Sequence, residues 1–557
     1  MNSRFLSLVK HILLIPSFVF LFTLSILAES PERESVVRVF IFAGQSNMVG
    51  SDSKARDVQR FPRYLDLEKP QSGIRFSYCI GRENKMRSEG WTDLQPVNNV
   101  IGPELSFGQK VRRVTKAPIA IVKCAAGGTH LGGDWNPNDP IGFKMYPLAL
   151  ELVRDSLAEL DNQNKKYRIE GFMWHQGEND MFNKEYMPNY GKNLKNFIAK
   201  WRADLESPKL KFYLGELCTK TIWGMDLRPR MYAISQGQKE VALADPLVEY
   251  LPTSHVGVEI GNPVGLHYHY GTLGQLQHGE NYADAYLRTI GKLKTPVRKL
   301  KKWPYSKGKK VKLFVLAGHR NMEGERAFVQ DLNQIKGRGD LLKDNHSIAY
   351  KYSLGGGYKN SDGWEPFGVV DYYDTFGPEL SLAHSLQAKL EESFAIAKYT
   401  HSGSQIIDWT PEGSMAKDRH LYPDFLSFVM KSIVELETKG NQVELAGIFY
   451  HVGENDMSFH PYRKDAAGRI KSIVEQSRKD LGLPKLRWFI SQQPPTDVER
   501  LNSLDAMGDV AKLAASDSAI IHIKALDLPP QEKRLVIRAD GILALGELIA
   551  RTYLGQK

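Results

Sequence analysis

Ser46 is the residue of this sequence best placed to act as a nucleophile. It stands in the motif GQSNM, directly after the apolar run Val37 to Phe42. A serine on a tight turn after a buried strand presents its hydroxyl to a crevice, and its own backbone N–H can stabilise an oxyanion. The alternative is a serine that caps a helix, which is common for an isolated Gly-x-Ser. Because further polar motifs occur downstream, we expect acyl transfer at Ser46.

Two of these downstream motifs also follow apolar runs directly. CAAGGTH contains the pair Gly127 and Gly128, and WHQGEND contains Gln176 and Glu178. If the runs before the motifs are neighbouring strands, their carboxyl ends bring the three motifs to one crevice.

Alternating apolar runs and helical patterns supply the elements that must position these motifs. Residues 147–160, 190–205 and 282–291 have the spacing of amphipathic helices. The predicted strands are short and rich in β-branched residues, and they cover 37–42, 119–122, 169–174, 211–214, 311–316, 394–398, 445–450 and 486–491. Strands that alternate with helices indicate a parallel sheet covered on both faces, which is a three-layer α/β fold.

The chain contains one unit twice. VRVFIFAGQSNMVG at 37–50 returns as VKLFVLAGHRNMEG at 311–324, IGPELS at 101–106 returns as FGPELS at 376–381, and GFMWHQGENDM at 171–181 returns as GIFYHVGENDM at 447–457. The three matches are colinear and have nearly constant offsets, so they indicate a tandem duplication. We therefore expect two domains, at 36–290 and 311–557, joined by a linker at 291–310.

The composition is that of a globular protein, and its charge is local. Of the 557 residues, 42% are hydrophobic and 25% are charged, and the net charge is +10. The stretch 291–312 carries ten Lys or Arg residues and no acid. A solvated linker explains this stretch better than a nucleic-acid site, so we expect no nucleic-acid partner. The cysteines Cys79, Cys124 and Cys218 form no zinc pattern and allow at most one disulfide.

The first 30 residues have the order of a secretory signal. Basic residues precede an apolar run at 12–28, which small and charged residues follow. We interpret residues 1–30 as a cleaved signal peptide that directs the protein to the periplasm or the exterior. The alternative is an uncleaved N-terminal anchor, because the run is long for a signal. No later stretch is long and apolar enough to cross a bilayer, so we expect no further membrane insertion.

FIFAGQSNM, the Gly-Pro-Glu segment, WHQGEND and a late histidine before GQLQHG resemble the SGNH hydrolases, in particular their sialate O-acetylesterase and acetyl-xylan esterase-like branch. The resemblance covers 36–290 well and the second half more weakly. It implies two tandem α/β/α domains of the SGNH-like, flavodoxin-like type with parallel sheets. It also implies that Ser46 is the acyl nucleophile and that no metal or cofactor is required. The oxyanion and substrate-binding candidates are Gln45, Asn47, Glu104, Gly127, Gly128 and Gln176.

The resemblance leaves two histidines as the general base. A match of GQLQHGENYA to the final helix of the family selects His269, whereas the family's GLH wording selects His267. The family often carries Asp three residues before its histidine, but Leu266 and Val264 stand there in this chain. Glu178 is the available substitute as the acid, and a structural role for Glu178 is an equal alternative.

The second half lacks the catalytic residues of the first. Arg320 replaces Ser46, Val452 replaces Gln176, and Val536 stands where a histidine is expected. The carboxylates that correspond to Glu178 and Glu104 persist in that half, as Glu454 and Glu379, so a structural role explains them. We expect a domain without catalysis, in which Arg320 either binds an anion or pairs with an acid such as Glu379.

We expect structural rather than functional roles for three further residues. His175 recurs as His451, so we expect it to be packed and hydrogen-bonded rather than catalytic. Trp135 is more often a packing residue than a platform for a sugar. Cys124 follows a strand, and its counterpart is Tyr399, so we expect it to be buried.

The sequence thus predicts an exported serine esterase that removes O-acetyl groups from carbohydrates such as sialic acid or xylan. The alternative from another class is a secreted carbohydrate-binding or scaffolding protein without turnover. A lipid-ester hydrolase has no support, because no amphipathic apolar lid stands out. The sequence does not predict the sugar, the ester position or the oligomeric state.

Overall fold

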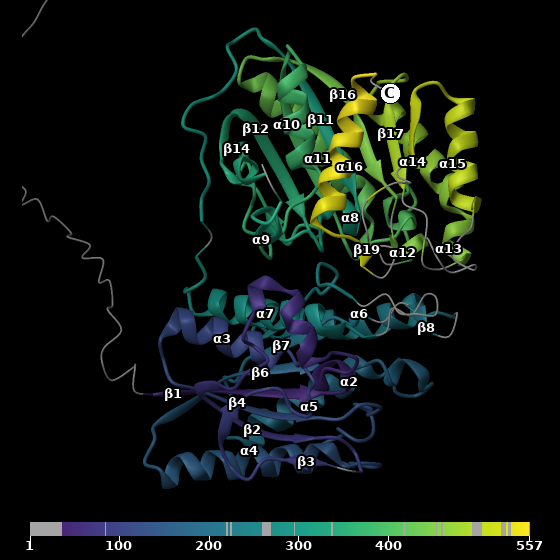
Figure 1. Ribbon diagram of the computed structural model, residues 1–557. Helices are drawn as coiled ribbons and strands as arrows, with labels where there is room; N and C mark the ends of the chain where they lie inside the picture. The colour runs from purple at the N-terminus through teal and green to yellow at the C-terminus, as the bar shows by residue number, and fades with distance from the viewer. Residues whose placement is uncertain are drawn as a thin grey trace, which may run out of the picture.

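The computed structural model describes residues 36–555, apart from 84, 219–220, 223–224, 259–268, 295, 336–337, 416–418, 453, 458–459, 493–503, 525–527, 529–530 and 533–535. The predicted signal peptide therefore lies outside the described residues. The chain folds into two α/β domains, each built on an eight-stranded sheet (Figure 1). The predicted fold class, two tandem α/β domains with mainly parallel sheets, is confirmed.

The first sheet has the strand order β10-β7-β6-β1-β5-β2-β3, with β4 beside β2. The strands from β10 to β2 are parallel, and β3 and β4 pair antiparallel with β2 at the edge. The bounds are β1 Val37–Gly44, β2 Gln71–Ile80, β3 Met86–Arg87, β4 Thr92–Leu94, β5 Ile119–Ala125, β6 Tyr167–His175, β7 Phe212–Gly215 and β10 Val248–Leu251. A short hairpin joins β8 Thr221–Ile222 to β9 Met225–Asp226.

Helices cover both faces of this sheet, and each face has its own apolar core. The side chains of β1 alternate between the two cores: Val39 and Ile41 face α4, α5 and α6, whereas Phe40 and Phe42 face α3 and α7. This alternation follows from the two-residue period of a strand that is buried on both sides. The helices are α2 Ser46–Val49, α3 Glu104–Thr115, α4 Met145–Asn162, α5 Tyr190–Asp204, α6 Arg228–Ala244 and α7 Gly271–Thr289.

The second sheet repeats the topology of the first. Its order is β13-β12-β15-β11-β16-β17-β18, with β14 beside β12. The bounds are β11 Lys310–Gly318, β12 Asn345–Leu354, β13 Lys359–Asn360, β14 Glu365–Phe367, β15 Ser393–Thr400, β16 Gln442–His451, β17 Trp488–Gln492 and β18 Ile520–Lys524. A separate pair consists of β19 Gln531–Glu532 and β20 Val536–Ile537.

The helices of the second domain again form two layers. One apolar core lies under α11 and α14, and the other lies under α10 and α16. The helices are α8 Arg320–Glu323, α9 Val329–Leu332, α10 Glu379–Lys389, α11 Leu421–Thr438, α12 Glu454–Met457, α13 His460–Lys464, α14 Ala466–Asp480, α15 Leu504–Ser516 and α16 Ala539–Tyr553. None of the described helices has the length and the apolar content needed to cross a bilayer.

The strand registers give an exact correspondence between the two halves. Gly44 at the end of β1 stands opposite Ala125 and His175. Gly318 at the end of β11 stands opposite Thr400 and His451 in the same way. The residues after these strands can therefore be compared position by position.

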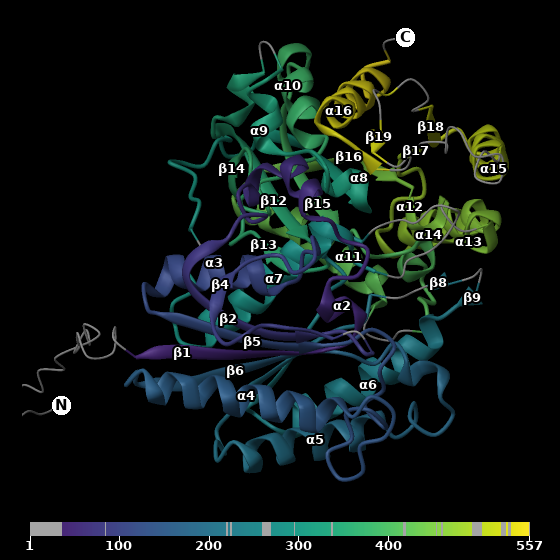
Figure 2. The ribbon, with the colours of Figure 1, turned by 60° about the horizontal axis from the view of Figure 1, so that its bottom comes forward.

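The linker is not wholly solvated. Tyr305 is buried in a core of the second domain and donates a hydrogen bond to Phe394 O, while Trp303 donates to Asn441 Oδ1 at 2.9 Å. The end of the predicted linker thus packs on the second domain. In the two views the domains lie against each other, with α8 and α12 on the side of the second domain that faces the first (Figures 1 and 2).

Candidate active site

Ser46 begins α2 immediately after β1, as the sequence predicted for a strand-to-helix turn. The chain enters this turn through Gly44, whose φ is +152° and whose missing Cβ would lie 2.0 Å from His175 O. Glycine is therefore required at position 44. Gln45 N donates to His175 O at 3.0 Å, and Ser46 is 8% exposed. The turn fixes the Ser46 side chain at the carboxyl edge of the sheet.

His269 lies next to this turn because its neighbour Tyr270 is bonded to Asn47. Tyr270 N donates to Asn47 Oδ1 at 3.3 Å, and Gln275 Nε2 donates to Asn47 O at 3.0 Å. These bonds hold the start of α7 against α2. The other candidate base, His267, lies outside the described residues.

Asp52 is the acid that contacts His269. Its Oδ2 lies 2.6 Å from His269 Nδ1, and its side chain is 68% exposed. The turn ties Asp52 to the serine, because the preceding Ser51 N donates to Ser46 O at 3.0 Å. A carboxylate on Nδ1 fixes the tautomer of an imidazole, which is what the acid of a serine hydrolase triad does. The sequence analysis missed Asp52.

The second half identifies the same three positions independently. The helices α2 and α8 have equal length, and both end at a left-handed glycine, Gly50 or Gly324. Arg320 therefore corresponds to Ser46, and Arg326 corresponds to Asp52. Ile537 N donates to Asn321 Oδ1 at 2.8 Å, as Tyr270 N does to Asn47, so Val536 corresponds to His269. All three triad positions differ together in the second half.

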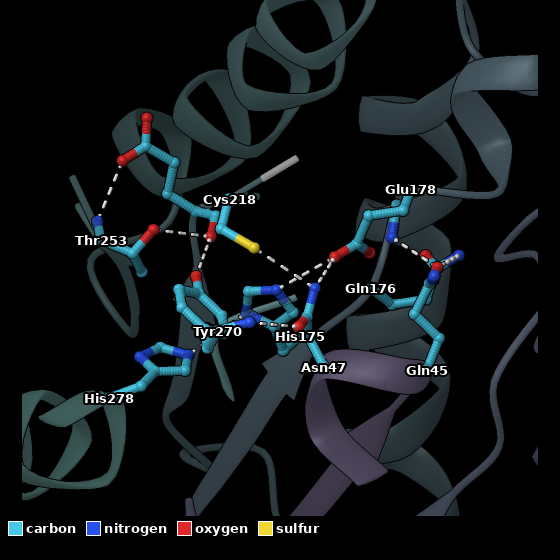
Figure 3. A network of polar contacts seen from close by, with 12 residues as sticks. Gln45, Asn47, His175, Gln176, Glu178, Cys218, Thr253, Tyr270 and His278 are labelled. Atoms are coloured by element: carbon cyan, nitrogen blue, oxygen red, sulfur yellow. Dashed lines mark hydrogen bonds and ion pairs between the residues drawn. The ribbon is translucent and has the colours of Figure 1, made fainter. Parts of the chain in front are cut away.

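Glu178 contacts two other residues rather than His269. Its Oε1 accepts a hydrogen bond from Asn47 Nδ2 at 2.7 Å and lies 3.3 Å from His175 Nε2 (Figure 3). Burial alone would raise the pKa of Glu178, but the bonds from His175 and Asn47 hold it below its usual value. An ionised carboxylate here orients Asn47, which in turn holds the histidine segment. Of the two roles considered for Glu178, the geometry fits the structural one.

Gln45 and Asn47 hold the serine turn through buried hydrogen bonds. Gln45 Oε1 accepts hydrogen bonds from Gln176 Nε2 and Gly177 N, both at 3.2 Å, and Gln45 is 1% exposed. Asn47 is fully buried between Glu178 and Tyr270. Both side chains join the serine turn to its neighbours, so a structural role explains them.

The expected oxyanion donor, Gln176, is occupied elsewhere. Its Nε2 donates to Thr129 O at 3.0 Å and to Asp180 Oδ2 at 2.5 Å, and it also lies within hydrogen-bonding distance of Gln45. The side chain is fully buried. An amide nitrogen carries two hydrogens, and these acceptors use both. Gln176 therefore does not reach the crevice, which corrects the sequence-based assignment.

Asn179, three residues further on, faces the crevice instead. Gln45 Nε2 donates to Asn179 Oδ1 at 3.1 Å, which turns the Asn179 Nδ2 group outward. That nitrogen lies 3.9 Å from the place that a Cβ on Gly128 would occupy, and Asn179 is partly exposed. A Cβ on Gly127 would lie 3.4 Å from Ser46 Cβ, so this glycine turn borders the serine directly. The sequence analysis missed Asn179.

Glu104 lies in a buried ion pair. Its Oε2 accepts from Lys123 Nζ at 2.7 Å, and the two side chains are 2% and 1% exposed. The second half has the same pair, in which Lys398 Nζ lies 2.7 Å from Glu379. The pair is present in both halves, whereas Ser46, Asp52 and His269 are present only in the first. A structural role therefore explains Glu104 better than substrate binding. Glu379 is likewise not the partner of Arg320.

The structural roles expected for His175, Trp135 and Cys124 are confirmed. His175 is fully buried, and its Nδ1 lies 3.2 Å from His278 Nε2. Trp135 is fully buried, and its Nε1 donates to Thr129 Oγ1 at 3.0 Å. Cys124 is buried, and Cys79, Cys124 and Cys218 form no disulfide. Among the described residues, no group of three or more His, Cys, Asp or Glu side chains is arranged to hold a metal ion.

Arg320, which replaces Ser46 in the second half, does not present an open positive charge. Arg320 is fully buried and forms an ion pair with Glu325, and its Nε donates to Asn455 Oδ1 at 3.2 Å. The expectation that Arg320 pairs with an acid is confirmed, but the acid is Glu325 and not Glu379. The burial of Arg320 and its pairing with Glu325 favour this role over the alternative, in which Arg320 binds an anion.

Several known proteins are similar to this chain. A probable carbohydrate esterase from Arabidopsis thaliana is 25% identical over 197 residues, which are 33% of this chain and 70% of that protein. A solved structure from Arabidopsis thaliana has 20% identity and a TM-score of 0.34, and it covers 45% of this chain and 98% of its own. NanS has 15% identity and a TM-score of 0.36, with coverages of 47% and 99%. A carbohydrate acetylesterase from Xanthomonas citri has 17% identity and a TM-score of 0.33, with coverages of 47% and 57%.

One family accounts for both halves of the chain. The family described as carbohydrate esterase, sialic acid-specific acetylesterase, matches residues 36–288 and again residues 310–555. The two matches coincide with the two α/β domains and together span most of the sequence. The chain therefore belongs to this family of carbohydrate esterases, as a tandem pair.

Proposed function

We propose that the first domain is a serine O-acetylesterase of carbohydrates. Ser46 is the nucleophile, His269 is the general base, and Asp52 orients the imidazole and stabilises its charged form. The oxyanion donors are the backbone N–H groups of Ser46 and of the Gly127-Gly128 turn, together with Asn179 Nδ2. The second domain has no esterase activity of its own.

The first chemical step forms an acetyl-enzyme. Ser46 Oγ attacks the acetyl carbonyl carbon while His269 Nε2 removes the hydroxyl proton, and the carbonyl oxygen becomes an oxyanion that the donors stabilise. The tetrahedral intermediate then expels the sugar oxygen, which takes the proton from the imidazolium. The products are a free sugar hydroxyl and acetyl-Ser46.

The second step reverses these roles with water. His269 Nε2 removes a proton from the attacking water, whose oxygen bonds to the acetyl carbon. The second intermediate collapses, the Ser46 oxygen leaves and recovers its proton from the imidazolium, and acetate is released. Each oxyanion donor contributes on the order of 10²- to 10³-fold in rate.

The observation that carries this proposal is the joint replacement of three positions. Ser46, Asp52 and His269 lie together in the first domain, and arginine, arginine and valine stand at the corresponding places in the second. Scaffold contacts persist in both halves, including the buried lysine–glutamate pair. Residues that change as a group while their scaffold stays constant are expected to act as one functional unit.

The substrate class follows from the family and its relatives. The family is described as a sialic acid-specific acetylesterase, and one relative is titled a carbohydrate acetylesterase. We infer acetylated sialic acid, xylan or another acetylated polysaccharide as substrate. We also infer that residues 1–30 direct export, which N-terminal sequencing of the mature secreted protein would test.

Turnover of 4-nitrophenyl acetate by the wild type and by Ser46→Ala tests the proposal. We expect the Ser46→Ala variant to fall below a hundredth of the wild-type rate with an unchanged melting temperature, because a hydroxyl at the crevice contributes little to the core. Equal rates in the two proteins would reject the nucleophile. Acetate release from acetylated sialic acids, xylan and sulfated algal glycans then identifies the sugar.

A further inference from the structure

A segment of the first domain occupies the crevice of the second. This inserted segment, residues 253–258, follows β10. Ser254 O lies against Gly403, where a Cβ atom would be only 2.1 Å away, and Ser402 Oγ donates to the same oxygen at 3.4 Å. By strand register, Gly403 corresponds to Gly128 of the glycine turn that borders Ser46. A backbone carbonyl of the first domain thus lies against one wall of the disused crevice.

The inserted segment also reaches the opposite wall. A Cβ on Gly257 would lie 3.4 Å from Glu325 Oε1, and Glu325 is the carboxylate that pairs with Arg320. Between these two ends, the ring of His255 stacks on Tyr358 with centroids 3.7 Å apart and an interplanar angle of 12°. The segment therefore spans the crevice from the glycine turn to the former nucleophile turn.

A buried ion pair joins the same region to the second domain. Arg419 of the second domain pairs with Glu216, which follows β7, and their side chains are 5% and 3% exposed. Thr253 N donates to Glu216 Oε2 at 2.9 Å, so the carboxylate also holds the inserted segment. Burial alone would raise the pKa of Glu216, but the charge of Arg419 and the Thr253 N–H hold it below its usual value.

Glu216 connects this interface to the candidate base. Tyr270 OH and Thr253 Oγ1 both donate to Glu216 O, each at 2.9 Å. Tyr270 is the neighbour of His269, and its backbone N–H is bonded to Asn47 on the serine turn. A continuous set of contacts therefore runs from Arg419 through Glu216 and Tyr270 to the Ser46 turn.

We propose that the second domain is a clamp that positions His269, and that its former substrate crevice now binds the inserted segment. The proposal rests on the proposed function, in which His269 is the base. Arg419 and Gly403 are positioning residues, since neither touches the reacting atoms. A displacement of about 1 Å in a catalytic group costs on the order of 10²-fold in rate, so a clamp of this kind affects turnover directly.

The experiment compares interface variants of the full chain. Arg419→Met removes the ion pair, Arg419→Lys keeps a cation, and Gly403→Ala places a methyl group against Ser254 O. Asp374→Asn is the control for the ion pair, because Asp374 lies 2.9 Å from Arg63 across the same interface and none of the described hydrogen bonds or ion pairs joins it to the inserted segment. Gly468→Ala is the matched control for the glycine, because nothing lies within 4 Å of its Cβ position.

We expect Arg419→Met and Gly403→Ala to lower kcat for 4-nitrophenyl acetate by about 10- to 100-fold with KM within twofold. Arg419→Lys should recover part of the loss, and both controls should stay within twofold. If Arg419→Met and Gly403→Ala keep kcat within twofold of the wild type, while Ser46→Ala abolishes turnover, the clamp is rejected and the catalytic assignment stands.

Hydrogen exchange supplies a readout that does not depend on turnover. Peptides that contain residues 253–258 and 269–275 should exchange at least tenfold faster in Arg419→Met than in the wild type, and unchanged in Asp374→Asn. Equal exchange in Arg419→Met and the wild type would overturn the clamp whether or not the wild type is an esterase. Absent turnover with the expected exchange would reject the proposed function but leave the clamp as a structural contact.

Discussion

His269 Nδ1 lies 2.6 Å from Asp52 Oδ2, although 217 positions separate the two residues in the chain. The acid therefore comes from the segment that carries the nucleophile, and not from residues just before the histidine. One turn holds both Ser46 and Asp52, because Ser51 N is bonded to Ser46 O. The histidine is the separately anchored member of the triad.

Replacement of Asp52 by asparagine should reduce kcat/KM by about 10³- to 10⁴-fold with little effect on stability. An amide in this position favours the wrong imidazole tautomer and no longer stabilises the imidazolium. The side chain is 68% exposed, so the fold does not depend on it. The measurement is steady-state hydrolysis of 4-nitrophenyl acetate.

Asp66→Asn is the matched control for that variant. Asp66 is also exposed and has a left-handed backbone, with a φ of +73° against +63° for Asp52, and asparagine tolerates this conformation. We expect wild-type rates in Asp66→Asn. Activity of Asp52→Asn within tenfold of the wild type would contradict the assignment of the acid.

Replacement of Asn179 by alanine should lower kcat by about 10²- to 10³-fold and leave KM nearly unchanged. The reason is that an oxyanion donor acts on the transition state and only weakly on the bound ester. Asn189→Ala, which removes an exposed amide at the start of α5, serves as the control. An unaltered kcat in Asn179→Ala would mean that another donor stabilises the oxyanion.

Restoration of serine at position 320 should not create a second active site. In the Ser46→Ala background, Arg320→Ser should add no esterase activity, because the acid and base positions of that half hold Arg326 and Val536. The variant should also lose up to about 3 kcal/mol of stability, since Glu325 remains buried and keeps only the longer contact with Arg326, at 3.8 Å.

The companion variant Arg320→Met/Glu325→Gln separates the two effects. It removes both charges and should regain most of that stability in urea denaturation. Esterase activity of Arg320→Ser above the Ser46→Ala background would show that the second crevice is still competent.

The interface should weaken in acid through His255. Burial lowers the pKa of His255 to about 3, and the nearby charge of Glu216 opposes this only in part. A histidine that stays neutral in the folded state contributes fully above its unfolded pKa of about 6.5, and the contribution declines as the pH falls toward 3. Between pH 7 and pH 5, the wild type should lose about 2 kcal/mol through this residue.

His255→Phe isolates that contribution. Phenylalanine can keep the stacking on Tyr358 but cannot bind a proton. Urea denaturation at pH 7 and pH 5 should show a smaller decrease in the free energy of unfolding for the variant. Identical decreases in the two proteins would mean that His255 does not titrate on unfolding.

Much of the fold could be predicted from the sequence, because the strand motifs of the first half recur in the second and the equivalent strands can be recognised from them. The predicted strand at 37–42 is β1, Val37–Gly44, and the predicted helix at 147–160 is α4, Met145–Asn162. The predictions missed the strand β2, whose partly exposed pattern alternates irregularly, and β10, which has only four residues. Short or edge strands owe their conformation to their neighbours rather than to their own periodicity.

The sequence predicts which motifs form the site but not which side chains contact one another there. GQSNM predicts Ser46 as the nucleophile, whereas the contact between Asp52 and His269 joins distant segments. A position-by-position comparison of the two halves, extended six residues past Ser46, would have revealed the change of Asp52 to Arg326. The motif alone did not show that Gln176 Nε2 donates to Thr129 O, which comes from a distant segment, and to Asp180, four residues further on. Hydrogen-bond competition of this kind depends on tertiary contacts.

The inserted segment in the second crevice also limits the number of ester groups of a polymeric substrate that one protein molecule can bind. Two open copies of a catalytic fold on one chain could engage two ester groups of the same polysaccharide and thereby gain avidity. With residues 253–258 across the second crevice, each protein molecule offers one reactive opening. An irreversible serine-directed titrant should accordingly consume one equivalent per chain, and a longer polysaccharide should gain no affinity from a second site.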